Sequence, residues 1–174
     1  RRRDLGFQFV AAGMTVGQIW EIVAFLMMGF WMRRVRIKYI MLVAIACGVL
    51  RYVLYAMGGI FPHFAWVLVG VSLHGICFTF FFETGRVFLN RRVDPGVRAQ
   101  VQALMTFASM GFGSLVGTIL CGWLHKHMVN GGLGGWAGYW SVLAAMCLGT
   151  GIYFFLGYRG MGAGASGSGH HRAY

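Results

Sequence analysis

Five apolar runs, each long enough to cross a lipid bilayer, constrain the fold of this chain more than any other feature. A transmembrane helix needs about 20 mostly apolar residues. By that measure the sequence predicts spans at about residues 5–32, 39–58, 64–89, 97–124 and 136–158. We therefore expect an all-α membrane protein, a polytopic helical bundle of about five transmembrane helices.

Composition and charge support this fold class. Of the 174 residues, 58% are hydrophobic and only 11% are charged, whereas charged residues make up roughly 25% of soluble domains. A formal net charge of +11 would suggest a nucleic-acid partner in a soluble protein. Here the basic residues cluster at the ends of the apolar runs, as they do in cytoplasmic loops of membrane proteins. We therefore expect a lipid bilayer, and no nucleic acid, as a partner.

The cysteines give no sign of a metal site. The four of them lie singly in apolar runs, without a C-x-x-C pair: Cys47, Cys77, Cys121 and Cys147. Isolated cysteines in such runs are typical of small buried residues. We predict neither a metal nor a cofactor.

The distribution of lysine and arginine predicts the orientation. Basic residues collect in the loops at residues 33–38 and 90–98 and near the C-terminus, which are therefore expected on the cytoplasmic side of the cytoplasmic membrane. The opening arginines, residues 1–3, oppose this assignment. Residues 1–159 are expected to form one transmembrane bundle, and residues 160–174, rich in Gly, Ala and Ser, a disordered cytoplasmic tail. An odd number of spans and an opening without methionine suggest a piece of a larger bundle.

The fourth span carries two local signals. Asp94 followed by Pro95 is typical of a helix start, with the aspartate as N-cap. Gly111, Gly113 and Gly117 include a G-x-x-x-G spacing, which predicts close packing against another helix.

The strongest functional signal is a carboxylate inside the first apolar run. Charge at that depth costs at least about 2.5 kcal/mol and marks a functional site by default. Glu21 and Gln18 are three residues apart and share one helix face. With a rise of about 1.5 Å per residue, Glu21 lies roughly 16 Å from the cytoplasmic end of its span. A carboxylate beside an amide there is suited to binding and releasing a proton.

A second group of polar and aromatic residues is predicted at a similar depth in the third span. His74 lies roughly 15 Å from the outer end of that span. Phe78 is one turn further on the same face, with Thr79 beside it, and could stack on a flat ring. Transporters place their substrate sites at this level.

Two other charged residues leave alternatives open. Glu83 is predicted near the cytoplasmic interface beside Arg86, where an ion-paired or snorkelling role is favoured. Arg51 lies about 9–10 Å from the outer end of its span. It fits an anchor, an internal partner for a carboxylate, or a role in coupling.

Several segments together resemble the nucleoside–proton symporter family of the major facilitator superfamily. They include G-Q-I-W-E (17–21), R-V-R-I-K-Y (34–39), L-H-G-I-C-F-T-F-F-F-E-T-G-R (73–86) and V-D-P-G-V-R-A-Q-V-Q-A-L (93–104). The resemblance covers about residues 7–123. It implies a partial major facilitator fold, in which these spans are the eighth to twelfth of twelve. The implied partners are a nucleoside, protons and the missing N-terminal half of the same chain.

The resemblance also implies individual roles. Gln18 and Glu21 match the family's Q-x-x-E pair, which contacts the nucleoside. His74 stands where bacterial members have a substrate-contacting tyrosine, and Phe78 matches an aromatic that packs on the ligand. Thr79 departs from the pattern, because the best-known members carry an aspartate there.

That departure affects the expected proton coupling. Without the aspartate, the proton-coupling candidates are Glu21, Glu83 and Arg51. The departure also leaves the solute less defined, so that a related polar molecule stays possible.

The predicted function is therefore proton-coupled nucleoside symport by alternating access. Alternatives are a symporter for another sugar-like or polar metabolite, and a non-transporting receptor or assembly protein of the same fold. A membrane enzyme is disfavoured, because no catalytic pair or metal-ligand set appears at one depth beyond Glu21 and His74.

Overall fold

The computed structural model describes residues 2–61, 63–129 and 133–158, with the side chains of residues 13–61, 63–129 and 134–158. The predicted tail at residues 160–174, Arg1 and the side chains of the other opening arginines lie outside this description. The helices are α1 (Arg2–Arg34), α2 (Ile37–Ile60), α3 (Phe64–Asn90), the 3₁₀-helix η1 (Pro95–Val97), α4 (Arg98–Thr106), the π-helix η2 (Phe107–Gly113), α5 (Ser114–Met128) and α6 (Leu133–Gly157).

Within the described residues, five helical segments are long and apolar enough to cross a membrane. They are Gly13–Arg34, Ile37–Ile60, Phe64–Asn90, Pro95–Met128 and Gly134–Gly157. The prediction of an all-α bundle with about five transmembrane helices is confirmed. Arg51 does not interrupt α2, which is continuous through it.

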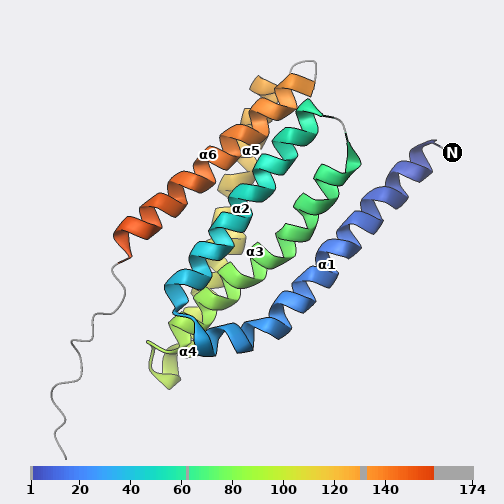
Figure 1. Cartoon of the computed structure of the whole chain (residues 1–174). Helices are drawn as coiled ribbons and strands as arrows, with labels where there is room; N and C mark the ends of the chain where they lie inside the picture. Colours follow the sequence, from blue (N-terminus) through green and yellow to red (C-terminus); the bar gives the residue numbers. More distant parts are fainter. Residues whose placement is uncertain (1, 62, 130–132, 159–174) are drawn as a thin grey trace, which may run out of the picture.

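The helix α3 organises the bundle. It packs along α2 on one side and α1 on the other, and α2 in turn packs on α6. In Figure 1 these four helices follow one another in the order α6, α2, α3, α1, while α4 and α5 run behind them. The shared core lies where α1, α2 and α3 meet, and is formed by Ala24, Met28, Ile40, Ala44 and Phe80. The outer faces carry large exposed apolar side chains, as expected for helices long and apolar enough to lie in lipid.

The contact between α1 and α3 depends on two glycines. A Cβ atom added at Gly75 would lie 2.5 Å from the carbonyl oxygen of Gly17 and 2.6 Å from the backbone nitrogen of Glu21. At Gly17 an added Cβ would lie 3.1 Å from Val71. Glycine at position 75 therefore allows the two backbones to touch at the level of Glu21.

The fourth predicted span is not one regular helix. It begins as expected, with Asp94 preceding Pro95 at the first helical position, although the aspartate side chain makes no capping hydrogen bond. The α-helical pattern then changes to a π-helix between α4 and α5. The Ser109 hydroxyl donates to the Met105 carbonyl at 2.6 Å, and a side chain that competes for a helix carbonyl in this way loosens the regular ladder.

The glycines of this span do not have the predicted role within the described chain. An added Cβ at Gly117 would meet nothing within 4 Å, and those at Gly111 and Gly113 would meet only Phe107 and Ala108 of the same segment. The predicted close packing at the G-x-x-x-G spacing is therefore wrong for contacts among the described helices. The close crossing lies at Gly75 instead.

Candidate functional site

A cavity of about 410 Å³, lined by both polar and apolar side chains, lies beside the crossing of α1 and α3. Its polar lining comes from two faces, with Gln18 and Glu21 on α1 and Thr79 and Glu83 on α3. Phe78 adds an aromatic wall. The remaining lining is apolar and belongs to α1: Ile22, Phe25 and Leu26.

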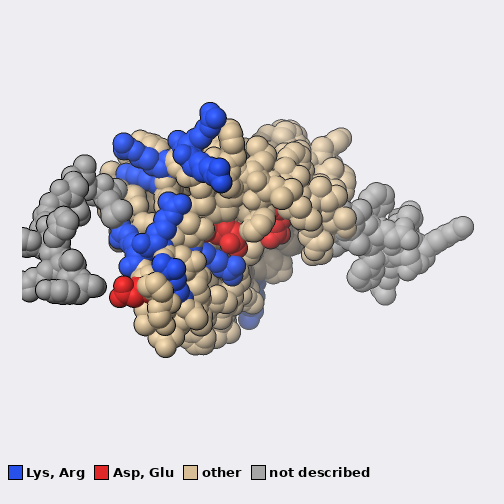
Figure 2. Space-filling view, turned by 90° about the horizontal axis from the view of Figure 1, so that it is seen from below, with Lys and Arg blue, Asp and Glu red and all other residues tan. Residues whose placement is uncertain are grey.

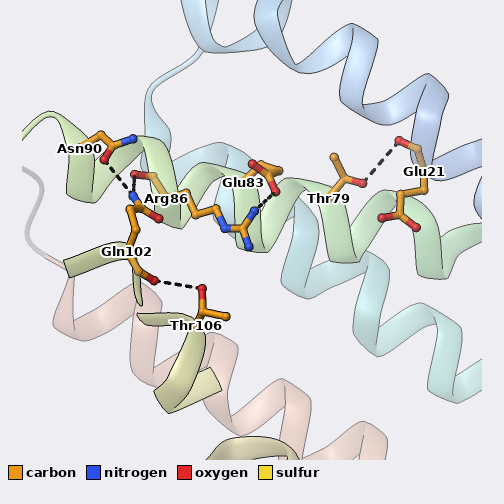
Figure 3. A network of polar contacts seen from close by, with 7 residues as sticks. All are labelled: Glu21, Thr79, Glu83, Arg86, Asn90, Gln102 and Thr106. Atoms are coloured by element: carbon orange, nitrogen blue, oxygen red, sulfur yellow. Dashed lines mark hydrogen bonds and ion pairs between the residues drawn. The ribbon is translucent and has the colours of Figure 1, made fainter. Parts of the chain in front are cut away.

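The backbone of Glu21 is held against α3 at two successive turns. At the first turn Gly75 allows direct backbone contact, as described above. At the second, the Thr79 hydroxyl donates to the Glu21 carbonyl oxygen at 3.5 Å, and the threonine is only 3% exposed (Figure 3). The carboxylate itself lines the cavity. This arrangement fixes the position from which the carboxylate projects, and its oxygens accept no hydrogen bond from the described residues.

The second carboxylate of the cavity is ion-paired. Glu83 Oε1 accepts from Arg86 Nη1 at 2.9 Å, three residues further along α3. Of the two roles left open for Glu83, the structure shows the ion pair with Arg86, and Glu83 also lines the same cavity as Glu21. Two carboxylates therefore face one space, one with a cationic partner and one without such a partner among the described side chains.

Beyond this ion pair, a hydrogen-bonded network joins α3 to α4. The side-chain amide of Gln102 on α4 donates to the Arg86 carbonyl oxygen at 3.0 Å and to Asn90 Oδ1 at 2.9 Å (Figure 3). The Thr106 hydroxyl donates to the Gln102 carbonyl at 2.9 Å. This network lies next to Glu83, at one end of the cavity. It connects that end of the cavity to α4, the beginning of the fourth span.

His74 and Arg51 lie in a second cavity, of about 330 Å³, lined by α2, α3 and α6. There the Arg51 guanidinium donates through Nη1 to His74 Nδ1. Phe78 lines both cavities, and its ring centroid lies 5.8 Å from that of His74. The structure therefore brings together Gln18, Glu21, Phe78, Thr79 and Glu83. His74 and Arg51 lie apart from this group, except for the ring of Phe78, which both cavities share.

Two contributors to the site were not found from the sequence. Gly75 sits inside the L-H-G run, where its spacing to another glycine of α3 gives no helix-packing pattern. Gln102 is one of two glutamines near the start of the fourth span, and nothing in the sequence separates it from Gln100. Among the described residues, no group of three or more His, Cys, Asp or Glu side chains is placed to hold a metal ion.

One end of the bundle is strongly basic. Figure 2, which looks at the molecule from below the view of Figure 1, shows many Lys and Arg side chains gathered on this face. The exposed arginines of the two predicted cytoplasmic loops are Arg33, Arg34, Arg36, Arg91, Arg92 and Arg98. Lys38 is anchored, because its Nζ donates to the Phe155 and Tyr158 carbonyl oxygens at 3.1 and 2.7 Å.

The chain is similar in sequence to known proteins over most of its length. The model of the nucleoside H⁺ symporter family matches residues 3–162. The putative nucleoside transporter YegT of Escherichia coli is 29% identical over 164 residues, which cover 90% of this chain and 39% of YegT. The nucleoside permease NupG of Escherichia coli is 32% identical over 133 residues, or 75% of this chain and 32% of NupG. The xanthosine permease of the same organism is 31% identical over 149 residues, 84% of this chain and 35% of the permease.

The fold is similar to that of a solved transporter. The crystal structure of NupG superposes with a TM-score of 0.75 at 29% identity, covering 86% of this chain and 37% of NupG. A mutant form of NupG gives a TM-score of 0.77 at 27% identity, over 84% of this chain. The chain spans between 32% and 39% of the length of the curated relatives that it matches.

Proposed function

Because this chain belongs to the nucleoside H⁺ symporter family, we propose that its helices form the C-terminal part of a proton-coupled nucleoside transporter of the major facilitator superfamily. The family and the matched relatives are transporters, not enzymes. The single observation that carries the proposal is the cavity at the α1–α3 crossing, where Glu21, Gln18 and Phe78 face one space.

The chemistry of this cavity suits a nucleoside. The Gln18 amide both donates and accepts hydrogen bonds, and an ionised carboxylate accepts only. Sugar hydroxyls and base edges need both kinds of partner. Phe78 offers a flat face on which a base can stack, and Thr79 fixes the helix against which these groups are arranged.

Proton coupling is proposed to act through Glu21. Binding a proton changes a carboxylate from a pure acceptor into a group with a donor, and removes a charge from the membrane interior. Protonation and solute binding in one cavity can therefore favour the same closed state. Alternating access then exposes the cavity to each side in turn.

The other predicted residues take secondary places in the proposal. Glu83 lines the same cavity and is a second coupling candidate, held by Arg86. His74 and Arg51, predicted as a solute contact and a coupling residue, line the second cavity. Because the Phe78 ring lines both cavities, these two residues would influence a solute near Glu21 by setting the position of that ring.

The topology is part of the same proposal. The chain is a multi-pass membrane protein, and we place it in the cytoplasmic membrane with the loops 33–38 and 90–98 and the C-terminus on the cytoplasmic side. Residues 1–159 would form one transmembrane bundle, with residues 160–174 as a cytoplasmic tail. The basic face seen in Figure 2 supports this orientation.

The test uses the intact parent protein in cells that lack their own nucleoside carriers. Uptake of labelled uridine is followed with and without a collapsed proton gradient. We expect Glu21→Gln to abolish gradient-driven accumulation while counterflow exchange survives. Asp94→Asn, the same chemical change in an exposed loop, is the matched control and should transport normally.

Two outcomes would overturn parts of the proposal. Normal accumulation by Glu21→Gln would remove Glu21 from proton coupling. No uridine uptake by a well-inserted parent protein would favour another polar solute, and Thr79 in place of the family's aspartate would be the first position to examine.

A further inference from the structure

The second cavity has a composition that differs from that of the proposed nucleoside site. Its wall is mostly apolar, with Ala44 and Ile45 from α2 and three phenylalanines from α3. Its only charged lining residue is Arg51. A cavity of about 330 Å³ is within the usual range for a small ligand.

Arg51 has no anionic partner among the described side chains. Glu21 and Glu83 line the other cavity, and Asp94 lies in the exposed loop before η1. The guanidinium instead lies over the Tyr52 ring, 4.6 Å from its centroid, and its Nε atom is buried without a hydrogen-bond partner. Charged side chains within membrane spans normally pair with one another or with backbone carbonyls.

The nitrogen atoms in this cavity offer only donors to a ligand. A guanidinium cannot accept, so the contact of Arg51 Nη1 with His74 Nδ1 requires a neutral histidine that carries its proton on Nε2. The Cys77 thiol and the Thr150 hydroxyl donate to the carbonyl oxygens of His74 and Met146, at 3.3 and 3.0 Å. The Arg51 Nη2 group and the Nε2–H of His74, which donate to no described residue, therefore call for an acceptor. The Nε atom of Arg51 is itself too enclosed to reach a ligand in the cavity.

We propose that this cavity binds a carboxylate, which neutralises Arg51 and accepts hydrogen bonds from Arg51 and His74. One cation beside a neutral histidine balances a single negative charge, which favours a carboxylate over a dianionic phosphate. The forked guanidinium matches the two oxygens of a carboxylate. The phenylalanine-lined wall fits an alkyl group attached to it.

The carboxylate has two possible sources with the same chemistry. It can belong to a free alkyl monocarboxylate, or to an aspartate or glutamate from the part of the parent protein outside this chain. The two cavities share only Phe78 among their described lining residues. Octanoate binding beside Arg51 is measured without uridine, so its failure leaves the nucleoside proposal standing.

The first arm of the test measures ligand binding by the purified intact parent protein in detergent, in a buffer free of carboxylates. Octanoate is the probe, and octanol is the uncharged control of the same chain length. For a free ligand we expect octanoate, but not octanol, to raise the thermal midpoint in a saturable way. Arg51→Met should lose that shift, whereas Arg91→Met, the same change at an exposed position, should retain it.

The second arm detects an internal carboxylate. In that case octanoate has no effect, Arg51→Met loses folding or uptake, and neutralising one acidic residue outside this chain restores it. Selection for second-site revertants of Arg51→Met identifies that residue.

A third variant covers the possibility that Arg51→Met does not fold and has no revertants. His74→Phe keeps the Arg51 charge and an aromatic ring at position 74 but removes the second hydrogen-bond donor. It should weaken the affinity for octanoate about tenfold, which is the value of one hydrogen bond to a charged group. The proposal is refuted if octanoate and octanol act alike on the parent protein and no acidic second site restores Arg51→Met.

Discussion

Replacing Gly75 by alanine tests whether the α1–α3 crossing positions the proposed site. The added Cβ would lie 2.5 Å from the Gly17 carbonyl oxygen and 2.6 Å from the Glu21 nitrogen, while ordinary contacts begin at 3.4 Å. The obstacle is backbone on both sides, so the two helices must separate by about 0.9 Å. Overpacking of this kind costs about 1–3 kcal/mol, and a shift of about 1 Å in a binding group can reduce a rate about 100-fold. We expect Gly75→Ala to insert but to lose between about 10- and 100-fold in uridine uptake.

The chain offers a graded set of controls for this substitution. Gly29→Ala on α1 meets nothing within 4 Å and should behave like the parent, whereas Gly17→Ala, with its nearest contact at 3.1 Å, should fall between the two. Uptake is normalised to the amount of protein in the membrane, so that loss of insertion is separated from loss of transport. Equal uptake by Gly75→Ala and Gly29→Ala would refute the argument that this crossing sets the position of Glu21.

Two further predictions concern the contacts that hold the ends of the bundle. Gln102→Leu removes two hydrogen bonds between α4 and α3 and should lower the free energy of unfolding of the intact protein by about 2 kcal/mol. The thermal midpoint should then be lower than that of Gln100→Leu, the same change at an exposed position. Equal midpoints for the two variants would argue against the network. Lys38→Met removes the cation that binds the last carbonyls of α6 and should speed amide exchange in that turn about tenfold, whereas Arg36→Met in the neighbouring loop should not.

The number and type of the membrane helices could be predicted from the sequence because they depend on length and apolarity alone. The pair Gln18 and Glu21 could be placed on one face because the helical repeat fixes their relation. The ion pair of Glu83 with Arg86 follows from the same repeat, at a spacing of three residues. Each of these predictions concerns residues on one helix.

Relations between helices were not predictable in this way. Depth along the span placed His74 level with Glu21, but depth does not give the rotation of α3 about its own axis. In the structure Thr79 faces α1 and His74 faces Arg51 on α2. The glycine pattern failed for a similar reason: a G-x-x-x-G spacing permits close packing, but whether another helix lies there depends on the remaining elements, as Gly117 and Gly75 illustrate.

The position of Phe78 links the two proposed sites. Its ring lines both cavities and lies between His74, 5.8 Å away, and Phe82, 4.6 Å away, measured between centroids. A ligand in either cavity restricts the motion of the Phe78 side chain. Once the first ligand has ordered this side chain, the second ligand binds at a smaller cost in conformational entropy. Linkage then requires the effect to be reciprocal: if a carboxylate beside Arg51 changes the affinity for uridine, uridine changes the affinity for the carboxylate by the same factor. Phe78→Leu, which retains an apolar wall but has no ring, should therefore weaken this coupling in both directions at once, even where each ligand still binds alone.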